Sequence, residues 1–243
     1  MKEALLVIDK EPGPTSFGVV KEVKRSLRGA KVGHTGSLDP FASGVLLLLV
    51  GRATKLSQGL INADKKYRAT VKLGEATDTL DRTGSITSSG DLPLLTQEKV
   101  EEVLRTFLGE WYQVPPAYSA KKIRGVRMYD LARQNICVRR TPIPVQIYSV
   151  KLIDYSSPFI EFEVHCSKGT YVRSFADELG VRLGTFAHLF ELKRLSCGSF
   201  SLADSIKVGT LVADPDRWVQ KGYQNYIRQL QQERLLRPYP LQS

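Results

Sequence analysis

A carboxylate side chain, Asp39, lies in a polar loop that runs directly into the most apolar stretch of the chain. Residues 31–50 read KVGHTGSLDPFASGVLLLLV, and the run at 45–50 is typical of a fully buried strand. Pro40 biases Asp39 toward an extended backbone, and Gly44 permits a close approach of other backbone. A carboxylate held beside the core can serve as a nucleophile or a base. It can equally accept hydrogen bonds from nearby amides in an Asx turn, a common arrangement for aspartate before proline.

The composition favours a basic protein with a polyanionic partner. The 243 residues carry a net charge of +10, and nucleic acid is the commonest polyanion that a protein of this kind binds. The 3 cysteines are widely spaced and never form a CxxC pair, which indicates neither a disulfide framework nor a zinc site. The sequence shows no signal-peptide pattern and no stretch of transmembrane length, so we expect a cytoplasmic protein with no membrane partner.

The elements that must position Asp39 follow from the spacing of apolar residues. Strands are expected at residues 4–8, 45–50, 66–73, 147–152 and 159–166 and within 192–200. Helices are expected after a cap at Thr15 or Ser16, after a cap at Thr96 and at 171–183. In residues 66–73 the strict alternation places Tyr67 on the apolar side. Strands come both in adjacent runs and separated by helices. This pattern predicts an α+β fold with a mixed, mostly antiparallel sheet flanked by helices.

For three helices, the spacing of apolar residues predicts which face is buried. The helix after Thr15 should bury Phe17, Val20 and Leu27, with Lys21, Lys24, Arg25 and Arg28 making the rest basic, either solvated or in contact with phosphate. The helix after Thr96 should bury Val100, Val103, Leu104, Phe107 and Leu108, and the helix at 171–183 should bury Phe175, Ala176, Leu179 and Leu183. Arg173 then falls in a first turn, where a cation opposes the helix dipole by about 0.3 to 1 kcal/mol. Asp177, four residues later, is one compensating partner.

A strongly basic segment occupies residues 121–140. It carries seven lysines and arginines against one aspartate, with apolar and aromatic residues between them. A solvated linker is rarely so one-sided, and this mixture of charge and stacking surface favours contact with RNA. Because its like charges repel, we expect the segment to be mobile without RNA and ordered with it.

The loop sequence GHTGSLDPFASGVL resembles the catalytic-aspartate motif of the TruB family of tRNA pseudouridine synthases. Further blocks resemble that family in the same order: DKKYRA (64–69), TDTLDRTG (77–84), PPAYSAKK (115–122), SKGTYVRS (167–174) and LKRLSCGSF (192–200). The resemblance covers roughly residues 5–200. It implies a pseudouridine synthase fold, and an isomerase that converts the T-loop uridine 55 of tRNA to pseudouridine without a metal or nucleotide cofactor.

The resemblance also implies a domain organisation and a partner. Residues 1–210 would form the catalytic domain, with an RNA-gripping loop at about 118–140. Residues 211–243 would form a short basic extension, helical and too short for the PUA domain of many bacterial relatives. We expect a monomer that binds the T arm of tRNA.

Family resemblance assigns catalytic roles to three residues. Asp39 would do the covalent or base chemistry, Arg173 would pair with it and keep it ionised, and Tyr67 would stack on the uracil and take its proton. The residues alone leave simpler roles open, a turn for Asp39, a core position for Tyr67 and an ion pair with Asp177 for Arg173. The atom that Asp39 attacks is also left open.

Three further residues are implied in substrate binding. Tyr171 and Leu192 would shape the uracil pocket, and His34 would fill the space that the flipped uridine vacates. Otherwise Leu192 would be a core residue and His34 a loop residue. The chain departs from the family at Lys10-Glu11-Pro12, where the family has lysine directly followed by proline, so no role is assigned to Lys10.

Two other functions compete with the isomerase. A non-catalytic RNA-binding protein on the same scaffold would use the basic segment but not Asp39. A nucleotide-phosphate enzyme is disfavoured, because the glycine-rich loop lacks both GxxxxGK[ST] and GxGxxG spacing.

Overall fold

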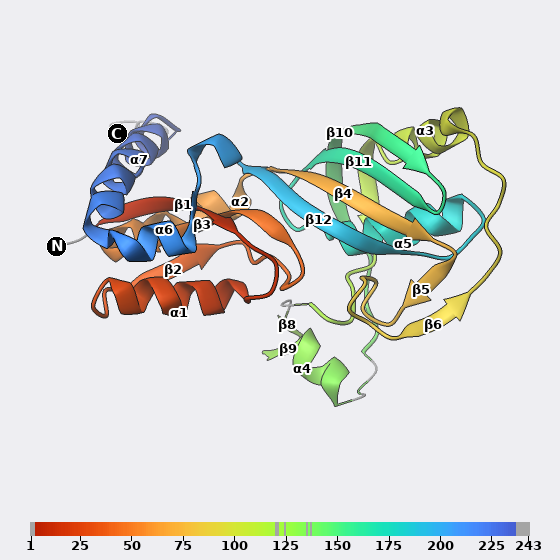
Figure 1. Cartoon of the computed structure of the whole chain (residues 1–243), viewed down its shortest axis with the longest axis horizontal. Coiled ribbons are helices and arrows are strands. Elements are labelled where there is room, and N and C mark those ends of the chain that lie inside the picture. The colour runs from red at the N-terminus through yellow and green to blue at the C-terminus, as the bar shows by residue number, and fades with distance from the viewer. Residues whose placement is uncertain (1–2, 120–121, 124, 135, 137, 237–243) are drawn as a thin grey trace, which may run out of the picture. The chain divides into compact units, whose positions relative to one another are not determined.

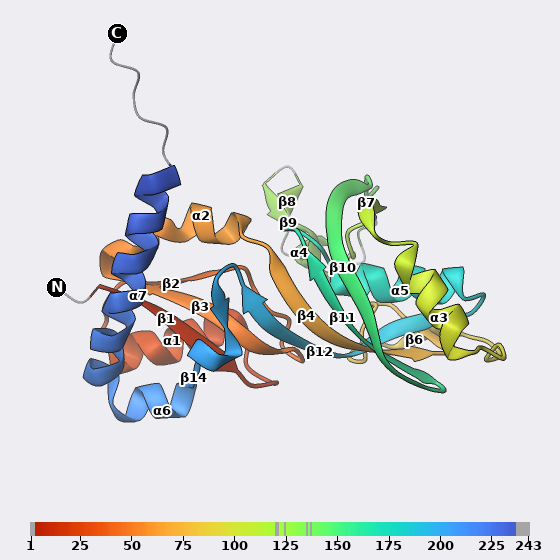
Figure 2. The ribbon, with the colours of Figure 1, turned by 90° about the horizontal axis from the view of Figure 1, so that it is seen from above.

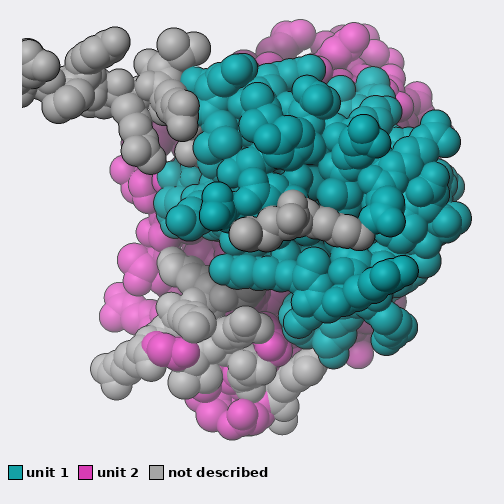
Figure 3. Space-filling model, turned by 90° about the vertical axis from the view of Figure 1, so that its left-hand side faces the viewer, with its two compact units in different colours: residues 1–65, 193–243 teal, residues 66–192 magenta. Residues whose placement is uncertain are grey.

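The structure is a computed structural model that describes residues 3–119, 122–123, 125–134, 136 and 138–236 (Figure 1). The chain divides into two compact units, which Figure 3 shows in different colours. Unit 1 comprises residues 1–65 and 193–243, and unit 2 comprises residues 66–192. In the sequence, unit 2 is therefore an insertion into unit 1.

Unit 1 contains a sheet with the strand order β14-β1-β3-β12, in which β2 also pairs with β3. Its strands are β1 (Ala4–Lys10), β2 (Val32–Thr35), β3 (Ser43–Val50), the end of β12 (Ala187–Cys197), β13 (Phe200–Ser201) and β14 (Ile206–Lys207). Strand β3 runs antiparallel to β1 and parallel to β12, with Gly44 opposite Arg194. Every residue at 45–50 is buried, so the predicted buried strand is confirmed.

Helices cover the sheet of unit 1. They are α1 (Ser16–Ser26), η1 (Gly51–Leu56), α2 (Ser57–Asn62), η2 (Leu202–Asp204), α6 (Val208–Ala213) and α7 (Pro215–Leu236). Helix α7 lies against β1 (Figure 2). The Asn225 side chain of α7 donates to the Leu5 carbonyl of β1 at 3.3 Å. The predicted cap of α1 is confirmed, because Thr15 Oγ1 accepts from the Gly18 amide at 2.9 Å. The prediction for Phe17 is wrong: it is 60% exposed, because the buried stripe of α1 runs through Val19, Val20 and Val23 instead.

Unit 2 contains strands in the order β12-β4-β11-β10-β7, with two separate short hairpins. The further strands and the short helix are β4 (Lys65–Leu73), β5 (Glu75–Thr77), β6 (Ile86–Ser89), β7 (Gly109–Gln113), β8 (Lys122–Ile123), β9 (Val126–Arg127), β10 (Ile143–Ser156), β11 (Phe159–Cys166) and α4 (Met128–Arg133). Strand β10 runs antiparallel to both β11 and β7. The alternation predicted for residues 66–73 is confirmed, because Tyr67, Ala69 and Val71 are buried between exposed or half-buried residues.

An aromatic cluster joins helices α3 (Gln97–Arg105) and α5 (Val172–Arg182) to the sheet of unit 2. Phe175 of α5 stacks on Phe107 at 4.0 Å between ring centroids and on Phe162 of β11 at 5.1 Å. The predicted inward face of α5 is confirmed, whereas the prediction for Leu108 is wrong because it is 46% exposed. Helix α3 ends at Arg105, so the helical spacing does not extend to Leu108.

The predicted α+β class is confirmed, since helices pack on sheets whose strand pairs are mainly antiparallel, with β1–β14 and β3–β12 as parallel exceptions. The predicted RNA-gripping segment at 118–140 is described only in part. Residues 120–121, 124, 135 and 137 lie outside the described residues, and the described part includes β8, β9 and α4. Among the described residues, no helix combines the length and the apolar character needed to cross a membrane.

Candidate active site

The loop that carries Asp39 connects β2 to β3 and is anchored by a buried lysine. Lys10, the last residue of β1, donates its ammonium protons to the carbonyls of Ala42 at 2.7 Å, Pro40 at 3.1 Å and Glu11 at 3.0 Å. Burial lowers the pKa of Lys10 to about 8, against the opposing effect of the Asp39 charge and with a smaller lowering by Arg194. Lys10 therefore remains mainly charged at pH 7, and two of its acceptors lie one and three residues after Asp39.

A second buried cation holds both ends of the same loop. Arg194 of β12 is 1% exposed, and it donates from Nε to the Val45 carbonyl at 2.6 Å and from Nη2 to the Gly36 carbonyl at 3.0 Å. Gly44 makes this approach possible, because its φ is +100° and an added Cβ would lie 2.8 Å from the Arg194 amide nitrogen. The backbone is therefore anchored by Arg194 on both sides of Asp39.

The residue before Asp39 is tied to helix α1. The buried Ser16 hydroxyl, at the first position of α1, donates to the Leu38 carbonyl at 3.1 Å, and its oxygen accepts from the Leu38 amide at 2.9 Å. Within the loop, the Asp39 carbonyl accepts from the Ala42 amide at 3.1 Å. These contacts involve backbone groups, so they hold the loop without using the Asp39 carboxylate.

His34 lies in strand β2, opposite Leu48 of β3. Its Nδ1 is buried and makes no hydrogen bond to a residue that the structure describes. Burial lowers the pKa of His34, and the positive charge of Arg194 lowers it further. The imidazole is therefore predominantly neutral at pH 7.

Arg173 of unit 2 lies in the first turn of α5 and is buried together with a carboxylate. Its Nη1 is 3.6 Å from Asp81 Oδ2, and the two side chains are 6% and 5% exposed. The guanidinium also donates to the carbonyls of Thr79 at 3.1 Å and Tyr118 at 2.9 Å. Asp81 thus compensates the cation at the helix start, a partner that sequence reasoning missed.

The loop that carries Asp81 is organised around that carboxylate. Asp81 Oδ1 accepts from the Thr83 amide at 2.9 Å, the Thr83 hydroxyl at 2.5 Å and the Thr79 hydroxyl at 2.8 Å. Asp81 faces Arg173 through its other oxygen, Oδ2. The only signal in the sequence was the alternation of threonine and aspartate in TDTLDRTG, which fits an ordinary turn equally well.

The alternative partner, Asp177, has a different environment. Burial raises the pKa of Asp177, Glu178 raises it further, and Arg140 opposes them. Arg140 is therefore the cation that acts on this carboxyl group, whereas Arg173 has its ion pair with Asp81.

The remaining candidates lie in unit 2 at half-buried or buried positions. Tyr67 is on the buried side of β4, and Leu192 is buried in β12. Tyr171 directly precedes α5, and its amide donates to Gln113 Oε1 at 2.8 Å, so the structure brings Tyr171 and Arg173 together at one helix start. Asp39 and His34 belong to unit 1, while Tyr67, Tyr171, Arg173 and Leu192 belong to unit 2.

The chemistry of these groups is that of acids, bases and hydrogen-bond donors. Within the described residues, no group of three or more His, Cys, Asp and Glu side chains is arranged to hold a metal ion. Lys10, Ser16 and Arg194, for which the sequence predicted no contact with the Asp39 loop, supply donors to the backbone around Asp39.

The fold and the anchored aspartate loop define a pseudouridine synthase. A chain in the solved structure entitled "Crystal Structure of a Cbf5-Nop10-Gar1 Complex" matches with a TM-score of 0.70 and 30% identity, over 94% of this chain and 59% of that chain. The family model described as TruB family pseudouridylate synthase (N terminal domain) matches residues 24–172. The chain belongs to the TruB family, and it is an isomerase.

Two relatives illustrate the similarity over most of the chain. The tRNA pseudouridine synthase B of Clostridium kluyveri is 45% identical over 204 residues, which are 84% of this chain and 70% of the relative. The protein of the same name from Bordetella avium is 44% identical over 216 residues, which are 88% of each chain.

Proposed function

We propose that this protein isomerises uridine 55 in the T-loop of tRNA to pseudouridine. The observation that carries the proposal is the anchored Asp39 loop in a chain of the TruB family. Lys10, Arg194 and Ser16 hold the backbone on both sides of Asp39 through contacts to main-chain groups rather than to its carboxylate. A reactive group on a fixed loop loses little entropy on reaching the transition state.

The proposed reaction breaks the bond between uracil N1 and the sugar C1′, turns the base, and forms a bond from C5 to C1′. C5 loses a proton and N1 gains one, so the atoms balance without oxidation, reduction or a cofactor. Asp39 acts as the nucleophile or the base, and Tyr67 stacks on the uracil and takes the C5 proton. Arg173, held by Asp81 and two carbonyls, supplies the positive charge that keeps Asp39 ionised.

Substrate binding completes the proposal. The uridine must leave the T-loop stack, which costs a few kcal/mol, roughly the usual size for base flipping. Leu192 and Tyr171 shape the pocket for the flipped base, and neutral His34 fills the vacated space. The partner is the T arm of tRNA, bound by a monomer in the cytoplasm, and the net charge of +10 supports a polyanionic substrate.

The test uses tRNA transcripts that carry tritium at uridine C5. Isomerisation at one position releases one tritium into water, and mass spectrometry of the product locates the pseudouridine. We expect stoichiometric release from wild-type tRNA and from an isolated T-arm stem-loop, and none from a transcript with cytidine at position 55. A protein that binds tRNA but releases no tritium would be a binding protein rather than an isomerase.

A further inference from the structure

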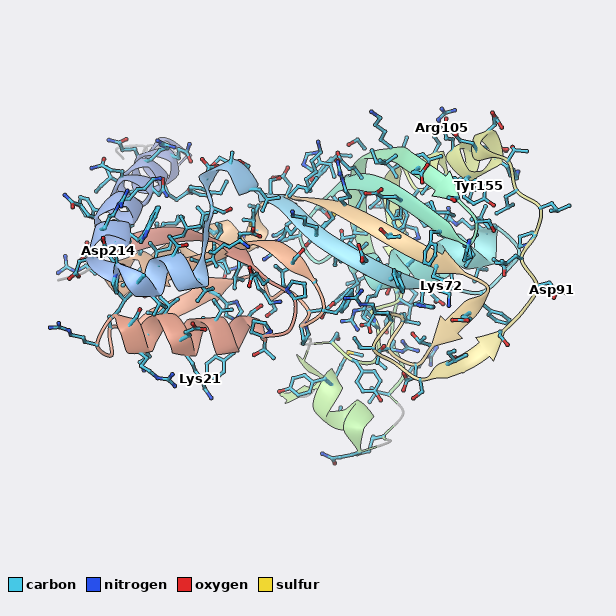
Figure 4. All side chains as sticks on the ribbon, viewed as in Figure 1. Lys21, Lys72, Asp91, Arg105, Tyr155 and Asp214 are labelled. Atoms are coloured by element: carbon cyan, nitrogen blue, oxygen red, sulfur yellow. The ribbon has the colours of Figure 1, made fainter. Side chains whose placement is uncertain are left out.

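Helix α1 carries a row of cations on its exposed side. Lys21, Lys24, Arg25 and Arg28 are spaced at i, i+3, i+4 and i+7, so they share one face of the helix and its end, and all four are exposed. Figure 4 shows Lys21 pointing outward from α1. Phe17, one turn earlier, is also exposed, and Lys21 Nζ lies 5.0 Å from the centre of its ring. We call these four cations the basic stripe.

The basic stripe is not neutralised within the protein. No ion pair joins its four cations to any residue that the structure describes, and Glu22 is the sole acidic residue of α1. Helix α3 of unit 2 shows the opposite arrangement, because Lys99 pairs with Glu102 and Arg105 pairs with Glu101, both at 3.0 Å. An exposed helix can thus pair its cations with carboxylates of its own, as α3 does. The four cations of the basic stripe form no such pair with a described residue.

The stripe ends at a residue with an unfavourable backbone. Arg28 has φ +54°, in the left-handed region that favours glycine, although Gly29 follows directly. Its amide donates to the Arg25 carbonyl at 3.1 Å, and the Gly29 amide donates to the Lys24 carbonyl at 3.0 Å, which are the bonds of a Schellman helix end. Arginine therefore occupies a position where glycine would meet less strain, which points to a use for its side chain.

An open groove runs beside the stripe. It has a volume of about 510 Å³ and is lined on α1 by Gly18, Lys21, Glu22, Arg25 and Ser26 and on α6 by Val212. Helix α6 has the sequence VGTLVA and brings no charge to the groove. Among these lining residues, Lys21 and Arg25 are cations and Glu22 is the single anion.

The spacing of the stripe fits a nucleic-acid backbone. From Lys21 to Arg25 the helix advances by roughly 6 Å at about 1.5 Å per helical residue. A nucleic-acid strand carries about one phosphate per 3.4 Å of its axis, so about two phosphates span the same length. The three cations on α1 therefore suit about two phosphates, and Arg28 adds a cation just beyond the end of the helix.

We propose that the basic stripe binds the phosphate backbone of the RNA substrate, as a contact surface separate in sequence from the Asp39 loop and from residues 118–140. The proposal rests on the proposed function and adds a second region of the chain to substrate recognition. RNA fits better than a lipid surface, because in α1, all of which the structure describes, Phe17 is the one exposed large apolar residue.

The test compares two double variants that remove the same charge from exposed helices. Lys24→Gln with Arg25→Gln alters the stripe, and Lys99→Gln with Arg105→Gln alters the paired cations of α3. Both variants lose two cations from one exposed helix, so the change in net charge is matched. The stripe variant loses both cations from the last turn of α1, and the α3 variant loses Arg105 from the last turn of α3. The dissociation constant for full-length tRNA is measured at several salt concentrations, together with tritium release at saturating enzyme.

For the stripe variant we expect tRNA affinity to fall at least about fivefold, and the slope of log affinity against log salt to shrink by about one to two. The α3 variant should stay within about twofold of wild type. Release of tritium at saturating enzyme should be unchanged in both, because neither pair belongs to the proposed catalytic groups. The exchange Lys24→Arg with Arg25→Lys keeps both charges and should bind as wild type does.

Equal losses of affinity in both double variants would overturn the proposal, since net charge alone would then explain them. It would also be overturned if the stripe variant bound tRNA normally but lost binding to vesicles that contain phosphatidylserine. Absence of tritium release by the wild-type protein would refute the proposed isomerase instead. The difference in tRNA affinity between the two double variants would still decide the role of the stripe.

Discussion

Replacing Asp39 by asparagine removes a charge from the loop but leaves its anchoring groups in place. Lys10, Ser16 and Arg194 bind backbone groups of neighbouring residues, and the Asp39 carbonyl keeps its bond from the Ala42 amide. The free energy of unfolding should therefore change by less than about 1 kcal/mol, the usual net value of one hydrogen bond. Lys10 loses the Asp39 charge that raises its pKa, so that pKa should fall below about 8.

The effect on chemistry should be much larger than the effect on stability. Loss of a general base alone lowers a rate by about 10² to 10⁴, and an amide cannot replace a carboxylate nucleophile either. We expect tritium release to fall at least about a thousandfold, which is roughly 4 kcal/mol of transition-state stabilisation. Affinity for tRNA should stay within about tenfold, or 1.4 kcal/mol, because phosphate contacts dominate binding.

Asp214→Asn is the matched control, because Asp214 also precedes a proline. Its exposed carboxylate accepts from the Arg217 amide at 3.3 Å at the start of α7, the turn-forming role that is the simpler explanation for Asp39 (Figure 4). The control should retain wild-type activity. Pseudouridine formation near the wild-type rate by Asp39→Asn would refute the catalytic assignment.

Other changes probe the anchors and the basic segment. Gly44→Ala should destabilise unit 1 by about 3 kcal/mol or more in urea unfolding, because φ +100° and the nearby Arg194 backbone leave no room for Cβ; a small loss would contradict this. Asp81→Asn should lower the free energy of unfolding by about 3 kcal/mol and reduce activity, because it removes the buried carboxylate that faces Arg173 at 3.6 Å; unchanged unfolding would argue against that pair. The depressed pKa of Lys10 means that the folded protein binds fewer protons than the unfolded chain between pH 8 and 10.5, so stability should rise with pH there by up to about 3 kcal/mol from this group. Lys10→Met should lose that rise, and an identical pH profile would contradict it. Glutamine replacements in residues 118–140 should flatten the salt dependence of tRNA binding, and hydrogen exchange should show stronger protection of this segment with tRNA than without it.

Local patterns in the sequence were sufficient to predict several elements. The apolar run at 45–50 became β3, the alternation around Tyr67 became β4, and the threonines before α1 and α3 became helix caps. These features depend on interactions between residues close in the chain, and hydrophobic periodicity reports them directly. The prediction for Phe17 was wrong because the apolar residues of this helix can form two different stripes. In the structure the buried stripe is the one that contains Val19, Val20 and Val23.

The partners of the buried charges could not be predicted in this way. Lys10 and Arg194 look like surface cations in the sequence, yet both are buried because distant carbonyls satisfy their protons. Arg173 pairs with Asp81 because α5 packs beside a loop that lies far from it in the sequence. Such pairings depend on tertiary packing, to which neither spacing nor charge pattern is sensitive.

The late position of Arg194 in the chain affects when a newly synthesised molecule can become active. A ribosome that adds about 5 to 20 residues per second needs roughly 8 to 30 seconds to pass from the Asp39 loop to residue 194. During that time the whole of unit 2 is made, whereas the Asp39 loop still lacks the guanidinium that binds the Gly36 and Val45 carbonyls. A nascent chain thus carries Asp39 on an incompletely anchored loop until Arg194 has been added and β12 has paired with β3.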